Sequence, residues 1–117
     1  MASSREIKLE REFEKMRNAL GNDQYCIQGS FDWKALYRYL GNGYNFEITR
    51  SDLCSGSAFK SFCAHVFVWV YNPNHIAERK SEFSKIETVE SIRSVEALKT
   101  ALDELVEKYS SNLPITA

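Results

Sequence analysis

The sequence lacks the features that mark secreted and membrane-spanning proteins. Its three cysteines, Cys26, Cys54 and Cys63, are widely spaced and cannot all pair within one chain, which favours reduced thiols in the cytoplasm over a disulfide scaffold. The longest apolar run has about half of the roughly 20 residues needed to span a bilayer. The opening residues, MASSREIKLERE, contain no apolar signal-peptide segment. We therefore expect a cytoplasmic protein with no membrane contact.

An excess of charge of one sign is also lacking. The 15 basic and 16 acidic residues give a formal net charge of −1. Nucleic-acid-binding domains are usually basic, and a DNA mimic would need a strong acidic excess, so both classes are disfavoured. With 117 residues, 44% hydrophobic and 26% charged, the chain has the size and composition of one folded domain. We expect that domain to span residues 1–117, with 112–117 as a loose tail.

Two amphipathic helical patterns stand near the ends of the chain. In the first, Ser3 and Glu6 have the spacing of a capping box, and Gly21 follows as a left-handed terminator. Its apolar stripe is Leu9, Phe13, Met16 and Leu20. The second pattern begins after Ser94, the expected N-cap. Its stripe is Val95, Leu98, Leu102, Leu105 and Tyr109.

Residues 31–40 fit two different structures. Aromatic or apolar side chains at the odd positions alternate with mainly charged ones, which is a strand pattern, and Gly41-Asn42-Gly43 is a hairpin turn. The return strand would be Tyr44–Arg50. A helix capped by Ser30 competes, because one alanine and two leucines favour it. The aromatic residues and the turn favour the hairpin, which we predict while leaving the helix open.

The most apolar stretch is FCAHVFVWVYNP, Phe62–Pro73. Its valines and aromatic residues predict a strand over residues 62–71, which the proline ends. A long polar loop, residues 51–61, precedes it, and residues 75–84 form a short helical turn or a loop after it. An edge strand is expected over residues 85–92. Together these elements predict an α+β fold, in which an antiparallel sheet of three to four strands is flanked by an N-terminal and a C-terminal amphipathic helix.

Side chains of the 62–71 strand alternate between two faces. One row is smooth and mostly β-branched: Phe62, Ala64, Val66, Val68 and Val70. The other row is bulky: Cys63, His65, Phe67, Trp69 and Tyr71. A row of rings is too large an apolar patch to leave in water, so three explanations compete. One helix covers each face of the sheet, another protein chain covers the rings, or the rings form an open platform or pocket for a ligand.

Catalytic, metal and cofactor sites have little support in the sequence. Cys63 and His65 share a strand face, an arrangement that can activate a thiolate, yet a cysteine in so apolar a segment usually acts as a small hydrophobic residue. Together with Cys54 and His75 they do not have the spacing of zinc ligands. The sequence contains no Gly-rich phosphate loop. We therefore expect no catalytic residue, no metal and no cofactor.

The predicted function is a non-enzymatic protein-binding module, such as a small inhibitor, immunity or adaptor-type protein. Its partner would be another protein or a second copy of the chain, with residues 51–61 at the rim of the contact. Tryptophan and tyrosine are common energetic centres of interfaces, and the candidate partner-binding residues are Phe67, Trp69, Tyr71, Trp33, Tyr37 and Tyr39. The alternative is a protein that binds a small ligand or single-stranded nucleic acid on the same rings. Its candidate phosphate contacts are Lys34, Arg38, Arg50 and Lys60.

Overall fold

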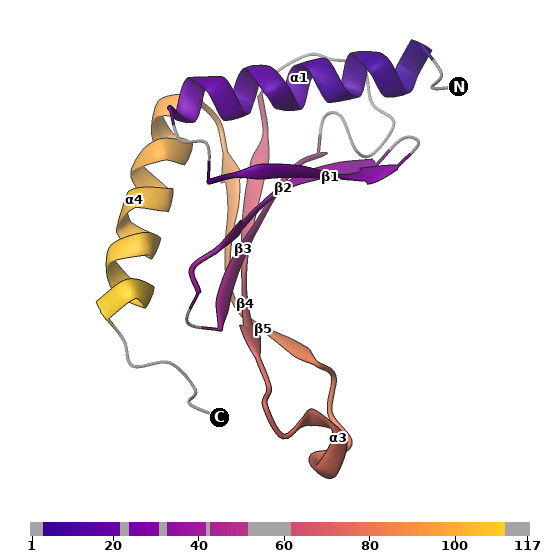
Figure 1. Cartoon of the computed structure of the whole chain (residues 1–117). Coiled ribbons are helices and arrows are strands. Elements are labelled where there is room, and N and C mark those ends of the chain that lie inside the picture. The colour runs from indigo at the N-terminus through magenta and orange to yellow at the C-terminus, as the bar shows by residue number, and fades with distance from the viewer. Residues whose placement is uncertain (1–3, 22–23, 31–32, 42, 52–61, 112–117) are drawn as a thin grey trace.

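The computed structural model describes residues 4–21, 24–30, 33–41, 43–51 and 62–111. Its elements are α1 (Ser4–Leu20), β1 (Cys26–Ser30), β2 (Trp33–Tyr39), β3 (Tyr44–Arg50), β4 (Ala64–Tyr71), α3 (His75–Glu78), β5 (Phe83–Ile92) and α4 (Val95–Ser111). The strands form one antiparallel sheet of five strands in the order β1-β2-β3-β4-β5, with a long helix at each end of the chain (Figure 1). The predicted α+β fold is confirmed.

The sheet has five strands where three to four were expected, and β1 is the strand that the sequence pattern does not predict. Its five residues, CIQGS, carry a single large aliphatic side chain, Ile27, so no alternation marks them. The strand forms because it pairs with β2 along its whole length and because Ile27 packs against the core.

The hairpin predicted after residue 31 is confirmed, and the competing helix is wrong. β2 and β3 are antiparallel partners, with Tyr37 opposite Glu47, and β3 has the predicted bounds. Gly41 and Gly43 have φ angles of +81° and +93°. Glycine adopts this left-handed region without the steric cost that a Cβ atom brings, so the glycines permit the reversal.

Both long helices pack on the same face of the sheet, which we call the inner face (Figure 1). α1 contacts β1, β2 and α4, and α4 contacts β5. The aliphatic row of β4 points to this face, since Ala64, Val66 and Val68 have no exposed surface and Val70 is 6% exposed. The explanation with one helix on each face is therefore wrong.

The predicted helical stripes form the core on this inner face. The four stripe residues of α1 are at most 5% exposed: Leu9, Phe13, Met16 and Leu20. Four of the five stripe residues of α4 are at most 6% exposed: Leu98, Leu102, Leu105 and Tyr109. No helix in the described ranges is long and apolar enough to cross a membrane.

Two of the predicted helix boundaries are confirmed. Gly21 follows α1 with a φ of +65°, and Ser94 Oγ accepts a hydrogen bond of 3.1 Å from the backbone N–H of Ala97. Ser3 of the predicted capping box, residues 52–61 of the predicted loop over residues 51–61, and the predicted tail over residues 112–117 lie outside the described residues.

A carboxylate on β5 ties that edge strand to α4. Glu87 lies opposite Val68 and so points to the inner face. It accepts a hydrogen bond of 2.8 Å from Lys108 Nζ and another from the Tyr109 hydroxyl. These two bonds, from Lys108 first and then from Tyr109, hold the pKa of Glu87 below its ordinary value.

We predict that Glu87→Gln lowers the free energy of unfolding at neutral pH by up to about 1 kcal/mol, since a charge-assisted hydrogen-bond acceptor is weakened but its Lys108 partner is exposed to solvent. A carboxyl whose pKa is lowered by folding contributes stability above its unfolded pKa and loses it as the pH falls through its folded pKa. Stability should therefore fall less in Glu87→Gln than in the wild type below about pH 4.5. Urea unfolding at neutral and acidic pH measures both effects. Glu90→Gln, on an exposed position of the same strand, is the control and should match the wild type.

Candidate functional site

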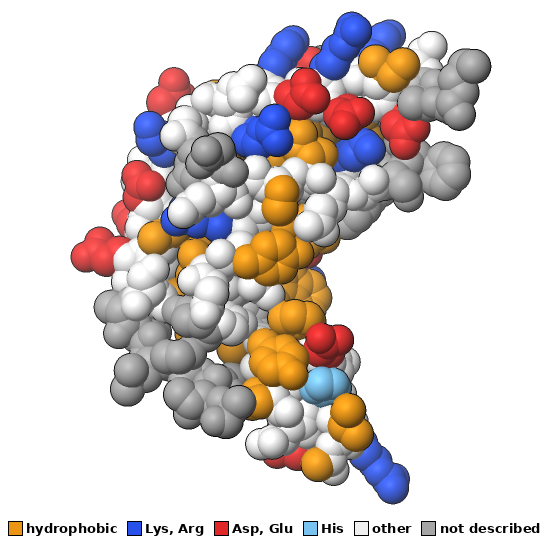
Figure 2. Space-filling model, viewed as in Figure 1, with side chains coloured by type: hydrophobic (Ala, Val, Ile, Leu, Met, Phe, Trp, Pro, Cys, Tyr) orange, Lys and Arg blue, Asp and Glu red, His pale blue; other side chains and the backbone are white. Residues whose placement is uncertain are grey.

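The sheet face opposite the helices carries the aromatic row of β4, and we call it the outer face. The strand register assigns residues to it: Tyr37 and Tyr39 of β2, Asn45 and Glu47 of β3, His65, Phe67, Trp69 and Tyr71 of β4, and Phe83 and Lys85 of β5. In the described part of the chain, neither α1 nor α4 packs on this face. The molecule is crescent-shaped, and hydrophobic side chains follow its hollowed edge (Figure 2).

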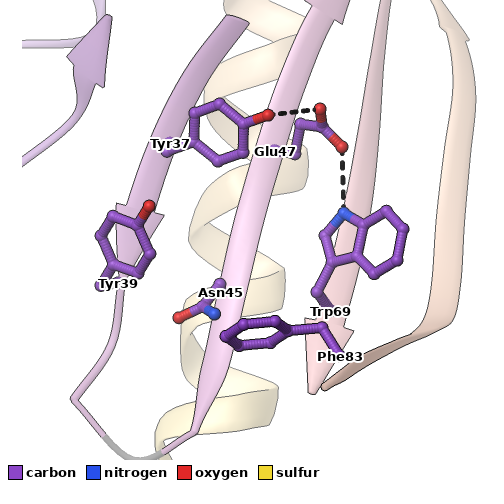
Figure 3. A pocket seen from close by; sticks show the side chains of 6 residues that line it. All are labelled: Tyr37, Tyr39, Asn45, Glu47, Trp69 and Phe83. Atoms are coloured by element: carbon purple, nitrogen blue, oxygen red, sulfur yellow. Dashed lines mark hydrogen bonds between the residues drawn. The ribbon is translucent and has the colours of Figure 1, made fainter. Parts of the chain in front are cut away.

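A hollow of about 340 Å³ lies on the outer face, lined by Tyr37, Tyr39, Asn45, Glu47, Trp69 and Phe83. Two walls of rings stand on either side of β3, with Tyr37 and Tyr39 on one side and Trp69 and Phe83 on the other (Figure 3). The two tyrosine rings are nearly parallel, with an interplanar angle of 14° and centroids 6.5 Å apart. Side chains of β3 form the polar floor between the walls.

Glu47 joins the two walls through its carboxylate. The Tyr37 hydroxyl donates to one of its oxygens at 2.7 Å, and the Trp69 indole N–H donates to the other at 3.0 Å. Both bonds are drawn in Figure 3. A carboxylate has about four acceptor positions, so each oxygen keeps the capacity to accept a further donor. The aromatic hollow therefore carries a fixed negative charge at its floor.

Burial, followed by the hydrogen bond to Glu47 and the charge of that carboxylate, raises the pKa of Tyr37 well above its ordinary value. Because folding raises this pKa, Tyr37 contributes stability that is complete below its unfolded pKa, near 10, and is lost as the pH rises through its folded pKa.

We predict that the unfolding free energy of Tyr37→Phe differs less between pH 8 and about pH 11 than that of the wild type. Urea titrations at the two pH values measure that difference. Tyr39→Phe, which removes a hydroxyl from an exposed ring, is the control, and equal pH dependence in all three proteins would contradict the prediction.

The rings of the outer face already hold one cation of the chain itself. Lys85 Nζ lies 4.2 Å from the ring centroid of Phe67 and 5.1 Å from that of Trp69. An ammonium over an aromatic face is attracted by the ring quadrupole, and the aliphatic stem of lysine shields part of the ring from water. This contact explains part of how the ring row tolerates a face without a helix.

Tyr71 contacts two further rings at the C-terminal end of β4. The Tyr71 ring lies 5.6 Å from that of Phe83 and 5.8 Å from that of His75 in α3, both in edge-on arrangements. His75 Nδ1–H donates to the carbonyl oxygen of Asn72 at 2.8 Å. The rings of the outer face are thus partly buried against one another, apart from Tyr39, which is 55% exposed.

The structure brings five of the six predicted partner-binding residues together on the outer face. Tyr37, Tyr39 and Trp69 line the hollow, while Phe67 and Tyr71 lie beside it on β4. The sixth, Trp33, begins β2, and its side chain lies outside what the structure describes.

Three lining residues were not predicted from the sequence: Asn45, Glu47 and Phe83. The first two could have been found from the alternation of β3, which places them on the face opposite Phe46. Phe83 could not, because the register between β4 and β5 shifts twice. Each irregularity inserts a residue and breaks the period of two, so no regular alternation survives in the sequence of β5.

On this side of the sheet, the imidazole of His65 has a structural contact. His65 Nδ1 accepts a hydrogen bond of 3.1 Å from the backbone N–H of Ser91, which links it to β5. Cys63 is partly buried just before β4. Over the described ranges, no group of three or more His, Cys, Asp or Glu residues is placed to hold a metal ion; Cys54 lies outside those ranges.

Three of the four candidate phosphate contacts point to the inner face. Lys34 and Arg50 are 7% and 9% exposed, with Lys34 Nζ 3.8 Å from Glu6 and Arg50 Nη1 3.7 Å from Glu12 of α1. The Arg38 guanidinium lies 5.3 Å from the ring centroid of Tyr25. Lys60 lies outside the described residues. Single-strand binders need cations beside their stacking rings, and these three are on the wrong side of the sheet.

Comparison with protein-family models, with curated proteins and with solved structures finds no significant match to this chain. Function therefore has to be inferred from the geometry of the outer face.

Proposed function

We propose that this protein is a non-enzymatic protein-binding module of the inhibitor or adaptor kind and that the outer face is its binding surface. The observation that carries the proposal is the gathering of rings from β2, β4 and β5 on the one face of the sheet that neither α1 nor α4 covers. A β-strand scaffold fixes these rings in place, so the rings would lose little side-chain entropy when a partner binds.

The chemistry of the hollow suits a protein contact. Tryptophan and tyrosine are enriched at interface hot spots, where they bury large area in a desolvated pocket. Glu47 is hydrogen-bonded to Tyr37 and Trp69, which pre-organises the two walls. Basic residues that would follow a nucleic-acid backbone are instead directed to α1 and Tyr25, so a protein partner is favoured over single-stranded nucleic acid.

A different protein is also favoured over a second copy of this chain. In a two-fold symmetric dimer each copy offers the same patch to the other. Two outer faces pressed together would bring two hollows, each with a Glu47 carboxylate at its floor, into one poorly hydrated interface. Like charges in such a setting repel. We expect light scattering to give the mass of a monomer; a dimer that dissociates in Trp69→Ala would instead make the self-contact the function.

Selection from a display library of random peptides tests the proposal. Peptides that bind the immobilised protein are measured again on Trp69→Ala and on Ile7→Ala, a matched variant that removes an exposed apolar side chain, 42% exposed, from α1. We expect the bound peptides to lose affinity for Trp69→Ala and to keep it for Ile7→Ala. Peptides that bind both variants equally would remove the outer face as the binding surface.

A further inference from the structure

The hollow combines aromatic walls with a negative floor, and this combination selects for a cation. The faces of tyrosine, tryptophan and phenylalanine rings attract positive charge, and four such rings line the hollow: Tyr37, Tyr39, Trp69 and Phe83. Glu47 adds a full negative charge between them (Figure 3). None of the six lining residues is basic.

In the described part of the chain, Glu47 forms no ion pair with a basic residue. Its two hydrogen bonds come from neutral donors, the Tyr37 hydroxyl and the Trp69 indole. The ion pairs of the described residues involve other carboxylates, those of Glu6, Glu12, Glu78 and Glu87. A partly desolvated carboxylate without a counter-charge is stabilised when a ligand supplies one.

We infer that the hollow binds the guanidinium group of an arginine side chain carried by the protein partner, an inference that rests on the proposed function. A guanidinium is planar and stacks on aromatic faces, and it is more weakly hydrated than an ammonium group, so its transfer into an aromatic hollow costs less. Two groups that line the hollow, the Glu47 carboxylate and the side-chain carbonyl of Asn45, are acceptors for its forked N–H donors. The volume of about 340 Å³ lies in the range of sites that enclose a ligand group.

The fold itself uses the same chemistry elsewhere. The Arg38 guanidinium lies over the ring of Tyr25 at 5.3 Å, and that of Arg50 over the ring of Phe62 at 4.6 Å. On the outer face, Lys85 Nζ lies 5.1 Å from the Trp69 centroid. Lys85 is the one lysine or arginine among the residues assigned above to the outer face, and its charge opposes a second cation in the hollow. Removing the Lys85 charge should therefore raise the affinity of the hollow for a cation, whereas removing the Glu47 charge should lower it.

Four capped peptides provide the probes: Gly-Ser-Xaa-Ser-Gly with arginine, citrulline, lysine or phenylalanine at the centre. Citrulline has nearly the shape of arginine and no charge. The peptides are titrated into ¹⁵N-labelled protein, and the indole N–H signal of Trp69 reports occupation of the hollow. We expect the arginine peptide to bind roughly tenfold more tightly than the citrulline peptide, with the lysine peptide between them and the phenylalanine peptide weakest.

Two substitutions should move the arginine affinity in opposite directions. Glu47→Gln keeps the size of the side chain and removes its charge, and should weaken arginine binding roughly tenfold while leaving citrulline binding unchanged. Lys85→Gln removes the opposing charge and should strengthen arginine binding about two- to threefold. A loss caused only by altered shape would not reverse sign between the two variants.

Equal binding of the arginine and citrulline peptides, or tighter binding of the phenylalanine peptide, would overturn the inference without any variant having to fold. A second arm separates this failure from failure of the proposed function. Each arginine in the library-selected peptides is replaced by citrulline, and affinity is measured again on the unaltered protein. If the selected peptides depend on Trp69 but not on an arginine, the outer face remains the binding surface and the inferred arginine contact is wrong. If the selected peptides do not depend on Trp69, the proposal that the outer face is the binding surface is wrong.

Discussion

Trp69→Ala is expected to weaken the binding of a protein partner by at least about 30-fold, or about 2 kcal/mol. Trp69 forms one wall of the hollow and donates its indole N–H to Glu47 at 3.0 Å. The substitution removes the largest ring of the hollow and leaves one carboxylate oxygen without its donor, so both contact area and pre-organisation are lost. Isothermal titration with a library-selected peptide measures the change.

Two further variants show whether the loss at Trp69 is one of contact. Trp69→Phe keeps a smaller ring in the wall and loses the N–H donor, and its affinity is expected to fall between those of the wild type and Trp69→Ala. Ile7→Ala, on the surface of α1, should bind as the wild type does. Circular dichroism confirms the fold of each variant before binding is measured. A Trp69→Ala protein that is folded and binds with unchanged affinity would contradict the prediction.

Phe46→Ala is expected to lower the free energy of unfolding by about 3–5 kcal/mol, the cost of a large cavity in a core. Phe46 has no exposed surface, and its ring lies 6.3 Å from that of Tyr109 on α4 in an edge-on arrangement. It therefore packs on the inner face, next in sequence to Glu47 on the outer face. The free energy of unfolding of a small domain is typically about 5–15 kcal/mol, so this single substitution would remove a large part of it. Urea unfolding measures the loss.

The binding of the Phe46 variants separates the two faces of the sheet. Phe46→Leu removes fewer atoms and should lose less stability, so its binding can be measured on a folded sample. We expect the affinity per folded molecule to stay within about twofold of the wild type, because no lining residue of the hollow changes. A loss of affinity in Phe46→Leu as large as that in Trp69→Ala would contradict the separation of a supporting inner face from a binding outer face.

The parts of the fold that the sequence predicts are those with strong local signals. The α1 and α4 stripes repeat over several turns, and their spacing fixes which side chains are buried. In β4 the clean alternation of valines with larger residues places Val68 inward and Trp69 outward, as the structure has them. The turn at Gly41 and Gly43, both with positive φ, decides the hairpin against the helix.

The parts that could not be predicted depend on contacts between segments distant in sequence. β1 exists because β2 pairs with it, and its own sequence has no strand period. The sequence identifies Glu47 as a residue of β3. Its position between two aromatic walls depends on the strand register, which places Tyr37 on one side of it and Phe67 on the other. Phe83 enters the hollow only after the register shifts of β5.

The placement of the helices illustrates the same limit. Each stripe predicts that a helix covers a sheet, but neither states which face it covers. Both helices pack on the aliphatic inner face, where Leu9 of α1 and Leu98 of α4 have no exposed surface. Branched aliphatic side chains interdigitate closely with a helix surface, whereas the outer face carries a carboxylate and ring hydroxyls that need hydrogen-bond partners. Packing quality, which a single sequence does not display, decides between the two faces.

Mapping of backbone amide chemical shifts on addition of the tightest library-selected peptide tests the central claim most directly. We expect the largest changes on β2, β3 and the start of β5, at Tyr37, Glu47 and Phe83, together with the amide and indole signals of Trp69. Amides of α1 and α4 should change little. Changes concentrated on the two helices, with the Trp69 signals unmoved, would contradict the assignment of the outer face as the binding surface.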